Sequence, residues 1–340
     1  MRTDLGVVVG GPLADLGALA SRAEGAGIGT VWLHEAGHDA VVAATVVTLA
    51  THQVRIGTDV MVAFARTPTL AAFSAWDLQE LSSGRFVLGL GSQVRRIVEE
   101  GFSAPFAPPA PRMAEYVRTV KAVLASLAGD TTPFAGDYYR VTRPAVYGVT
   151  DPDRPLPPVH LAAVGPMMTR VATCHADGVV GHPFTTPRYL TDVLVPRVEG
   201  AVAAAGRARG DIEVSTGVIV EVDDDRDAAR TRARRQVAFY GTTPNYRTVF
   251  EANGEGELTD RCRAAFRDGG MARLHEAIPE DALDRYAVAG TPGEAAAGLR
   301  AWMGHVDHLI ATTPTNGRAP AEVSAAVART IDAVAHAAAE

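Results

Sequence analysis

The segment from Thr30 to Ala40 reads TVWLHEAGHDA and contains the pattern His-Glu-x-x-His. On a helix, two histidines four residues apart lie on one face and can bind zinc, while the glutamate acts as a general base. Here the pattern directly follows TVWL, a run preceded by Gly27 and Gly29 whose composition is typical of a strand. The next glutamate after Glu35 is Glu80, and the remaining candidates for a third ligand, His52 and Asp59, lie where the end of another helix or a strand is expected. We therefore expect a strand end here, with no metal site and no metalloprotease.

Polar side chains that follow predicted strands are the candidates for chemistry, because active sites of (β/α)8 barrels are built from the C-terminal ends of the strands. His34, Glu35 and His38 lie at the end of the strand predicted over 30–35, and His182 follows the apolar run GVVG. Histidine changes charge near neutral pH, so we predict His38, Glu35 and His182 as the residues that exchange protons with a substrate. The alternative for His34, Glu35 and His38 is that one or two of them only cap the next helix or contact neighbouring loops. The alternative for His182 is an ordinary loop contact.

The elements that would position these residues alternate along the whole chain. Short apolar runs predict eight strands, over 5–10, 30–35, 55–64, 85–91, 158–165, 178–184, 212–222 and 308–314. Amphipathic runs between them predict helices, which begin at caps such as Asp39, Thr67-Pro68 and the Thr291/Glu294 capping box.

This alternation predicts one domain over 1–340, an α/β (β/α)8 TIM barrel with a helical insertion over 241–289 between strands seven and eight. A C-terminal helix is expected over 319–340. A doubly wound open sheet is the alternative, but eight regular units fit a closed barrel better.

Composition excludes several classes of partner. The net charge of −7 over 340 residues argues against nucleic acid and against an anionic membrane surface. No run reaches the roughly 18 apolar residues that a membrane-spanning helix needs. Two cysteines without CxxC spacing, Cys174 and Cys262, are typical of a reducing compartment, so we expect a cytoplasmic protein without disulfides.

Several of these segments together resemble the luciferase-like family of flavin and deazaflavin oxidoreductases. The resemblance is carried by GAGIGTVWLHE, by RIGTDVMVAFARTPTLAAFSAWDLQELSSGRFVLGLGSQ, by PVHLAAVGPMMTRVATCHADGVVGHPFTTPRYL and by VAGTPGEAAAGLR. It runs over most of the chain. Within the family it is strongest to the branch that uses coenzyme F420, a deazaflavin, through AFARTP, LGLGSQ and HPFTTPRYL.

The resemblance implies where a cofactor would bind. It places a non-proline cis peptide at Asp59-Val60, behind the isoalloxazine-like ring, and brings Gly91, Ser92 and Gln93 up to the ring and its side chain. It also places Ala163, Val164, Gly165 and Pro166 beside the phosphate-bearing tail, because amides at a helix N-terminus suit a phosphate. From the residues alone, an ordinary trans strand and a plain helix start remain open.

One departure from the family concerns the end of strand two, where an Asp-His pair is common. This chain has Glu35, then Ala36 and Gly37 before His38, so the acidic role passes to Glu35 and the histidine is displaced. A second departure is the scarcity of lysine. With Lys121 as its one lysine, in a predicted surface helix, the chain gives no support for a sugar-phosphate substrate.

The resemblance implies an F420-dependent oxidoreductase that transfers a hydride between the deazaflavin and a small organic substrate. Two alternatives stay open, an FMN-dependent monooxygenase on the same barrel and a non-catalytic barrel that only binds a cofactor. Members of the family commonly pair through helices on the barrel side, so we expect a homodimer or a larger homo-oligomer. The Ala-rich helix over 40–52 would allow two subunits to approach closely.

Overall fold

The chain folds as a (β/α)8 barrel, as the sequence predicts. A computed structural model describes residues 3–130, 133–143 and 151–339. Its long strands all belong to one sheet, which closes on itself to form the barrel. The chain forms two compact units, one of Met1–Val31, Gly181–Gly200 and Val214–Glu340, the other of Trp32–Val180 and Ala201–Glu213. We call them unit 1 and unit 2 and describe each by itself. Residue 340, the last of the predicted C-terminal helix, lies outside the described residues.

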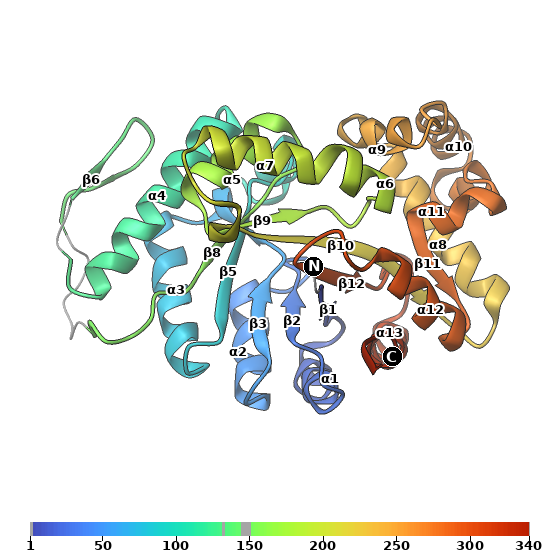
Figure 1. The fold of residues 1–340 in the computed structure, drawn as a ribbon, viewed down its shortest axis with the longest axis horizontal. Coiled ribbons are helices and arrows are strands. Elements are labelled where there is room, and N and C mark those ends of the chain that lie inside the picture. Colours follow the sequence, from blue (N-terminus) through green and yellow to red (C-terminus); the bar gives the residue numbers. More distant parts are fainter. Residues whose placement is uncertain (1–2, 131–132, 144–150, 340) are drawn as a thin grey trace. The chain divides into compact units, whose positions relative to one another are not determined.

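Unit 2 contains barrel strands two to six with the helices between them (Figure 1). The sheet order is β2-β3-β5-β8-β9, and β4 pairs with β5 beyond the end of β3. The elements are β2 (Thr30–Leu33), α2 (Ala40–Ala50), β3 (Arg55–Thr58), β4 (Met61–Val62), α3 (Pro68–Leu81), β5 (Phe86–Gly91), α4 (Pro109–Leu127), β8 (Val159–Ala162), α5 (Pro166–His175) and β9 (Gly178–Gly181). A short hairpin, β6 (Phe134–Ala135) with β7 (Arg140–Val141), extends from α4 and was not predicted.

Gly89 of β5 is required by close packing between neighbouring strands. A Cβ atom on Gly89 would lie 1.8 Å from the carbonyl oxygen of Thr58. The Thr58 hydroxyl donates to the Gly89 carbonyl at 2.7 Å and accepts from the Gly89 N–H at 2.9 Å. These two hydrogen bonds hold the end of β3 against β5, and only glycine leaves room for this approach.

Unit 1 contains the first and last barrel strands in the order β11-β10-β12-β1. Its β10 is long, and its first half pairs with β12 while its second half pairs with β11. The elements are β1 (Asp4–Val8), α1 (Leu13–Gly25), α6 (Pro187–Tyr189), α7 (Val195–Ala204), β10 (Glu213–Val222), α8 (Arg226–Gly241), α9 (Arg247–Ala252), α10 (Leu258–Arg273), α11 (Leu283–Tyr286), β11 (Ala287–Gly290), α12 (Pro292–Trp302), β12 (His308–Thr312) and α13 (Pro320–Ala339).

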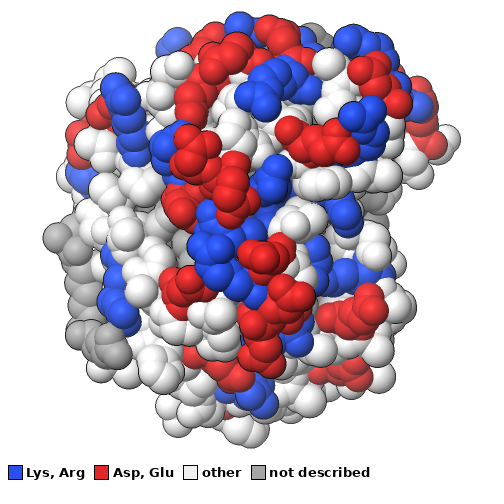
Figure 2. All heavy atoms as spheres, turned by 90° about the vertical axis from the view of Figure 1, so that its right-hand side faces the viewer, with Lys and Arg blue, Asp and Glu red and all other residues white. Residues whose placement is uncertain are grey.

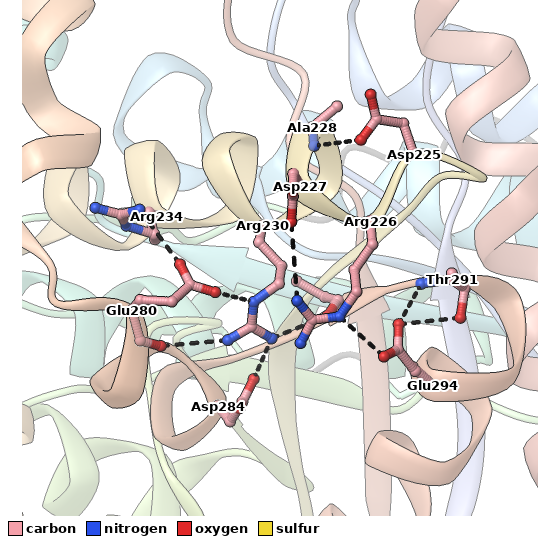
Figure 3. Close-up of polar contacts among 11 residues, drawn as sticks. Asp225, Arg226, Asp227, Ala228, Arg230, Arg234, Glu280, Asp284, Thr291 and Glu294 are labelled. Atoms are coloured by element: carbon pink, nitrogen blue, oxygen red, sulfur yellow. Dashed lines mark hydrogen bonds and ion pairs between the residues drawn. The ribbon is translucent and has the colours of Figure 1, made fainter.

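The segment predicted as a helical insertion holds α9, α10 and α11, but it ends in the strand β11 (Figure 1). Alanine and glycine make up three of the four residues of β11, so no strand signal was visible in AVAG. Ion pairs fasten this segment to α8. Arg230 of α8 binds the carboxylates of Glu280 and Asp284 (Figure 3). Arg234 donates to the Ile278 carbonyl at 2.9 Å.

The predicted helix starts are confirmed. Asp39 accepts from Val41 N–H, Thr67 accepts from Leu70 N–H, and Thr291 with Glu294 forms a capping box. Within the described ranges, no helix is both long and apolar enough to cross a membrane.

Acidic and basic side chains are interleaved on the face of the molecule drawn in Figure 2. Several of the charged residues of unit 1 are ion-paired, such as Arg226 with Glu294 and Arg285 with Glu255.

Candidate functional site

Residues 34–39, which carry the His-Glu-x-x-His pattern, form a loop between β2 and α2. The helix on which both histidines would share one face is absent at this place, so the predicted strand-end context is confirmed. Among the residues that the structure describes, no group of three or more His, Cys, Asp or Glu side chains is arranged to hold a metal ion. The same loop instead belongs to a network of hydrogen bonds at the strand ends of unit 2.

Glu35 is the centre of that network. Its carboxylate forms a two-pronged ion pair with Arg66, at 2.7 Å and 2.6 Å, and accepts from the Val62 N–H at 2.6 Å. It also accepts from Ala40 N–H at 3.3 Å, at the start of α2. Only 6% of the Glu35 side chain is exposed. Each carboxylate oxygen thus has two donors, an arrangement that holds the loop, α2 and β4 together.

Arg66 was not among the predicted site residues. Besides Glu35 it binds Asp39, the N-cap of α2, at 2.6 Å. Burial lowers the pKa of the Arg66 guanidinium, but the bonds with Glu35 and Asp39 outweigh it, so the pKa lies above its ordinary value. A lone arginine after strand three, with two acidic residues after strand two, was the signal in the sequence that could have indicated this pair.

The peptide bond between Asp59 and Val60 is cis, as predicted. It lies between β3 and β4, where the Val60 side chain packs against β5. A Cβ atom on Gly91 would lie 2.3 Å from Cγ2 of Val60 and 3.7 Å from Cβ of Ala162. The structure therefore brings Asp59-Val60, Gly91 and the end of β8 together, three of the segments that the sequence predicted to surround a cofactor.

Ser92 and Gln93 continue the chain beyond β5. Gln93 has φ of 55°, a left-handed conformation that is uncommon for a residue other than glycine. Its side chain accepts from the Val94 N–H at 3.0 Å, and the Ser92 hydroxyl donates to the Gln93 carbonyl at 3.2 Å. These local hydrogen bonds define a sharp turn directly after Gly91. The chain leaves the strand at this turn.

Gly165 is the N-cap of α5, and Pro166 is the first residue of that helix. Gly165 has φ of −99°, so no left-handed conformation demands glycine there, and a Cβ atom would meet nothing within 4 Å. No side chain caps the first turn of α5. Ala163 is buried, while Val164 and Gly165 are partly exposed. An open space in front of an uncapped helix start fits a phosphate group, which amides at a helix N-terminus bind well.

His34 pairs with Asp59, which the sequence analysis did not anticipate. The Nε2 atom of His34 lies 3.3 Å from Oδ2 of Asp59. The Asp59 side chain is 8% exposed and the His34 side chain 32% exposed. A nearly buried carboxylate thus orients a histidine ring that remains accessible to a small molecule.

The sequence matches the family model described as luciferase-like monooxygenase over residues 1–308. An uncharacterized protein of Mycobacterium tuberculosis is 38% identical over 275 residues, which are 79% of this chain and 81% of the relative. The chain belongs to the luciferase-like monooxygenase family. An F420-dependent glucose-6-phosphate dehydrogenase of Amycolatopsis mediterranei is 27% identical over 312 residues, 87% of each chain. The F420-dependent tetrahydromethanopterin reductase of Methanopyrus kandleri shares the fold, with a TM-score of 0.80 and 20% identity over 98% of this chain and 97% of that one.

The remaining predicted site residues of this luciferase-like chain are His38 and His182. His38 is exposed in the loop before α2. His182 follows β9 in unit 1, where its Nδ1 accepts from the Phe184 N–H at 3.0 Å. The Tyr246 ring stacks on it at a centroid distance of 4.2 Å, and the Tyr240 ring meets it edge-on at 4.6 Å. The hydrogen bond to Nδ1 requires the neutral ring to carry its proton on Nε2. Both histidines stay predictions as proton-transfer residues.

Proposed function

We propose that the chain is an F420-dependent oxidoreductase that transfers a hydride between the deazaflavin and a small organic substrate. The observation that carries the proposal is the arrangement of strand ends in unit 2, where the cis peptide Asp59-Val60 packs on Gly91 beside β8. The names of the relatives add support, since proteins that resemble this chain over most of its length are named as F420-dependent dehydrogenases. When bound, the cofactor would supply the carbon that accepts or donates the hydride.

Two groups of residues would hold the cofactor. Asp59, Val60, Gly91, Ser92 and Gln93 would contact the ring and its side chain. Ala163, Val164, Gly165 and Pro166 would face the tail, with the first amides of α5 donating to its phosphate. These residues fit such a group because the backbone at Gly165 is approachable, with nothing within 4 Å of the place of a Cβ atom.

Titration of the purified protein with F420 and, separately, with FMN tests the cofactor assignment. We expect saturable binding of F420, measured by the fluorescence of the cofactor. We also expect a substrate to reduce the bound cofactor. Tight binding of FMN with no binding of F420 would refute the proposal in favour of a flavin monooxygenase. Binding of F420 without hydride transfer to any substrate would instead indicate a barrel that only carries the cofactor.

Gly165→Val is the sharpest variant for the phosphate site. A branched side chain would occupy the open space in front of α5, and we expect at least a tenfold loss of F420 affinity, on the order of 1.4 kcal/mol. The melting temperature should change little, since nothing lies within 4 Å of the new Cβ atom. Gly293→Val is the matched control, because Gly293 lies in the first turn of α12 and also has open space beside it. Unchanged F420 affinity in Gly165→Val would remove Gly165 from the site.

We also propose that the chain forms a homodimer in the cytoplasm through α2 and α3. No residue of α2 is charged, and its Val42 and Leu49 are 49% and 68% exposed. Leu70 of the adjacent α3 is 57% exposed. A helix that is apolar on all sides is normally covered by protein. Light scattering at micromolar concentration should give the mass of a dimer for the wild type and of a monomer for Leu49→Arg, and a monomeric wild type would refute the proposal.

A further inference from the structure

A pocket lined by charged and polar side chains lies wholly within unit 1. Its walls are the end of β10, one side of α8 and the loop between β12 and α13. The polar residues that line it are Glu221, Arg232, Arg235, Gln236, Asn316 and Arg318. Asn316 donates to the Gln236 side chain at 3.1 Å, so the loop is joined to α8 beside the pocket. The sequence analysis predicted none of these residues as part of a site.

Glu221 is the carboxylate of this pocket, and its two oxygens differ. The residue is 0% exposed. Its Oε1 accepts from Nε of Arg232 at 2.9 Å and also from Arg318. Its Oε2 is buried and has no hydrogen-bond partner among the residues that the structure describes. A buried acceptor without a donor is costly, so the pocket favours an occupant that brings a hydrogen-bond donor to Oε2.

Arg235 has the opposite requirement. Its Nε is buried and, within the described ranges, donates to no acceptor. The nearby charges are also unbalanced, since Arg232 and Arg318 share Glu221, and Arg232 reaches only one further carboxylate, Asp223 at 2.5 Å. Three arginines are thus present for two carboxylates, and the excess of positive charge favours an anion. Arg232 is 28% exposed, so this side of the pocket can be reached from solvent.

We propose that this pocket binds inorganic phosphate and that it uses none of the proposed cofactor residues. Hydrogen phosphate brings negative charge for the arginines and an O–H group that donates to Oε2 of Glu221. Its remaining oxygens accept from Nε of Arg235 and from Arg232. Sulfate has the charge but no O–H group at neutral pH, so the Glu221 carboxylate repels it. A phosphate monoester loses its last proton at about pH 6 and above that pH also lacks the donor.

Calorimetric titration at about pH 8 with phosphate, and separately with sulfate at equal ionic strength, tests the proposal. Gly165→Val should be the background protein, because the helix start at Gly165 is itself proposed to bind the phosphate of F420. We expect one phosphate to bind saturably and sulfate to bind at least about tenfold more weakly. The melting temperature should rise with phosphate concentration, since the ligand binds only the folded chain.

Arg235→Gln is the sharpest variant, because Nε of Arg235 has no bond within the described chain to lose. We expect its affinity for phosphate to fall at least about tenfold, with an unchanged melting temperature in the absence of phosphate. Arg267→Gln is the matched control, an exposed arginine of α10 in the same unit. Glu221→Gln replaces the acceptor by an amide that also donates, so a folded variant should bind sulfate more tightly than the wild type does.

Four results would overturn the proposal. Absence of saturable phosphate binding would leave the pocket without an anion. Equal affinities for phosphate and sulfate would contradict the role of Glu221. An unchanged affinity in Arg235→Gln would remove phosphate from this pocket. Tighter binding of methyl phosphate than of inorganic phosphate at the same pH would exclude inorganic phosphate as the ligand. The F420 proposal is independent of all four, because it is tested by titration of the wild type with F420.

Discussion

Each of the two units contains a cluster of carboxylates around one arginine, and the two clusters differ in how far their carboxylates are exposed to water. In unit 2, Arg66 is 16% exposed and its partner Glu35 only 6% exposed. In unit 1, Arg230 is 7% exposed, but its partners Glu280 and Asp284 are 54% and 68% exposed (Figure 3). The first cluster is an ion pair buried on both sides, and the second is a buried cation reached by carboxylates from the surface.

This difference in exposure predicts how much stability each cluster loses when one of its carboxylates is removed. Removal of one partner of a doubly buried pair leaves an uncompensated charge without water, which costs far more than the pair itself contributes. Where the acids are exposed, water replaces one of them and the buried arginine keeps the other. We infer that the Glu35 cluster shapes the candidate site and that the Arg230 cluster fastens the segment of α9–α11 to α8.

The largest effect is expected for Glu35→Ala. The change leaves Arg66 with only Asp39, which is 47% exposed, and leaves the Val62 N–H without its acceptor. We expect the free energy of unfolding, measured in urea, to fall by about 3 kcal/mol. The double variant Glu35→Ala with Arg66→Ala should lose less than the two single losses combined, because the unpaired cation is gone. A loss below about 1 kcal/mol would show that this pair is not the stronger of the two clusters.

Glu280→Ala should cost about 1.5 kcal/mol, since the buried Arg230 keeps Asp284 and the carbonyl of Ala289 as partners. Hydrogen exchange should locate the loss in residues 241–289, the part that this cluster fastens. Asp227→Ala is the control, because Asp227 is 95% exposed and lies 3.8 Å from Arg226. A loss as large as that of Glu35→Ala would break the comparison.

Glu294→Gln tests a carboxylate that is bonded but exposed. Glu294 accepts from the Thr291 N–H at 2.9 Å and from Arg226, and these bonds hold its pKa below the ordinary value. A carboxyl whose pKa is lowered in the folded state adds stability above its unfolded pKa and loses it as pH falls through the folded pKa. We expect the variant to be less stable than wild type by about 0.5 kcal/mol at pH 7, and this difference to shrink as the pH falls through the folded pKa. A difference that does not shrink as the pH falls would contradict an electrostatic origin.

The smallest effect is expected for Glu100→Ala. Its partner Arg96 is 82% exposed and Glu100 itself 67% exposed, so the pair exchanges freely with water. The urea midpoint should not change within error. A measurable loss here would mean that exposure does not rank the ion pairs of this chain.

Much of the fold followed from the sequence because the relevant interactions are local. The caps at Asp39, Thr67 and Thr291 act on amides two or three residues away, so the residue types alone predicted where these helices begin. Apolar runs predicted the eight barrel strands, whereas AVAG was too short and too small in its side chains to indicate β11. The cis peptide at Asp59-Val60 was predicted from the family resemblance.

The candidate site was only partly predictable, because its decisive contacts join residues far apart in the chain. The sequence by itself placed His34 and Glu35 at the end of one predicted strand and Asp59 within the next, which in the structure ends at Thr58. Only the tertiary structure decided that Glu35 pairs with Arg66, 31 residues away, and that His34 pairs with Asp59, 25 residues away. The reason is geometric. Strand pairing and the path of the loop set which faces meet, and no spacing along the sequence carries that information.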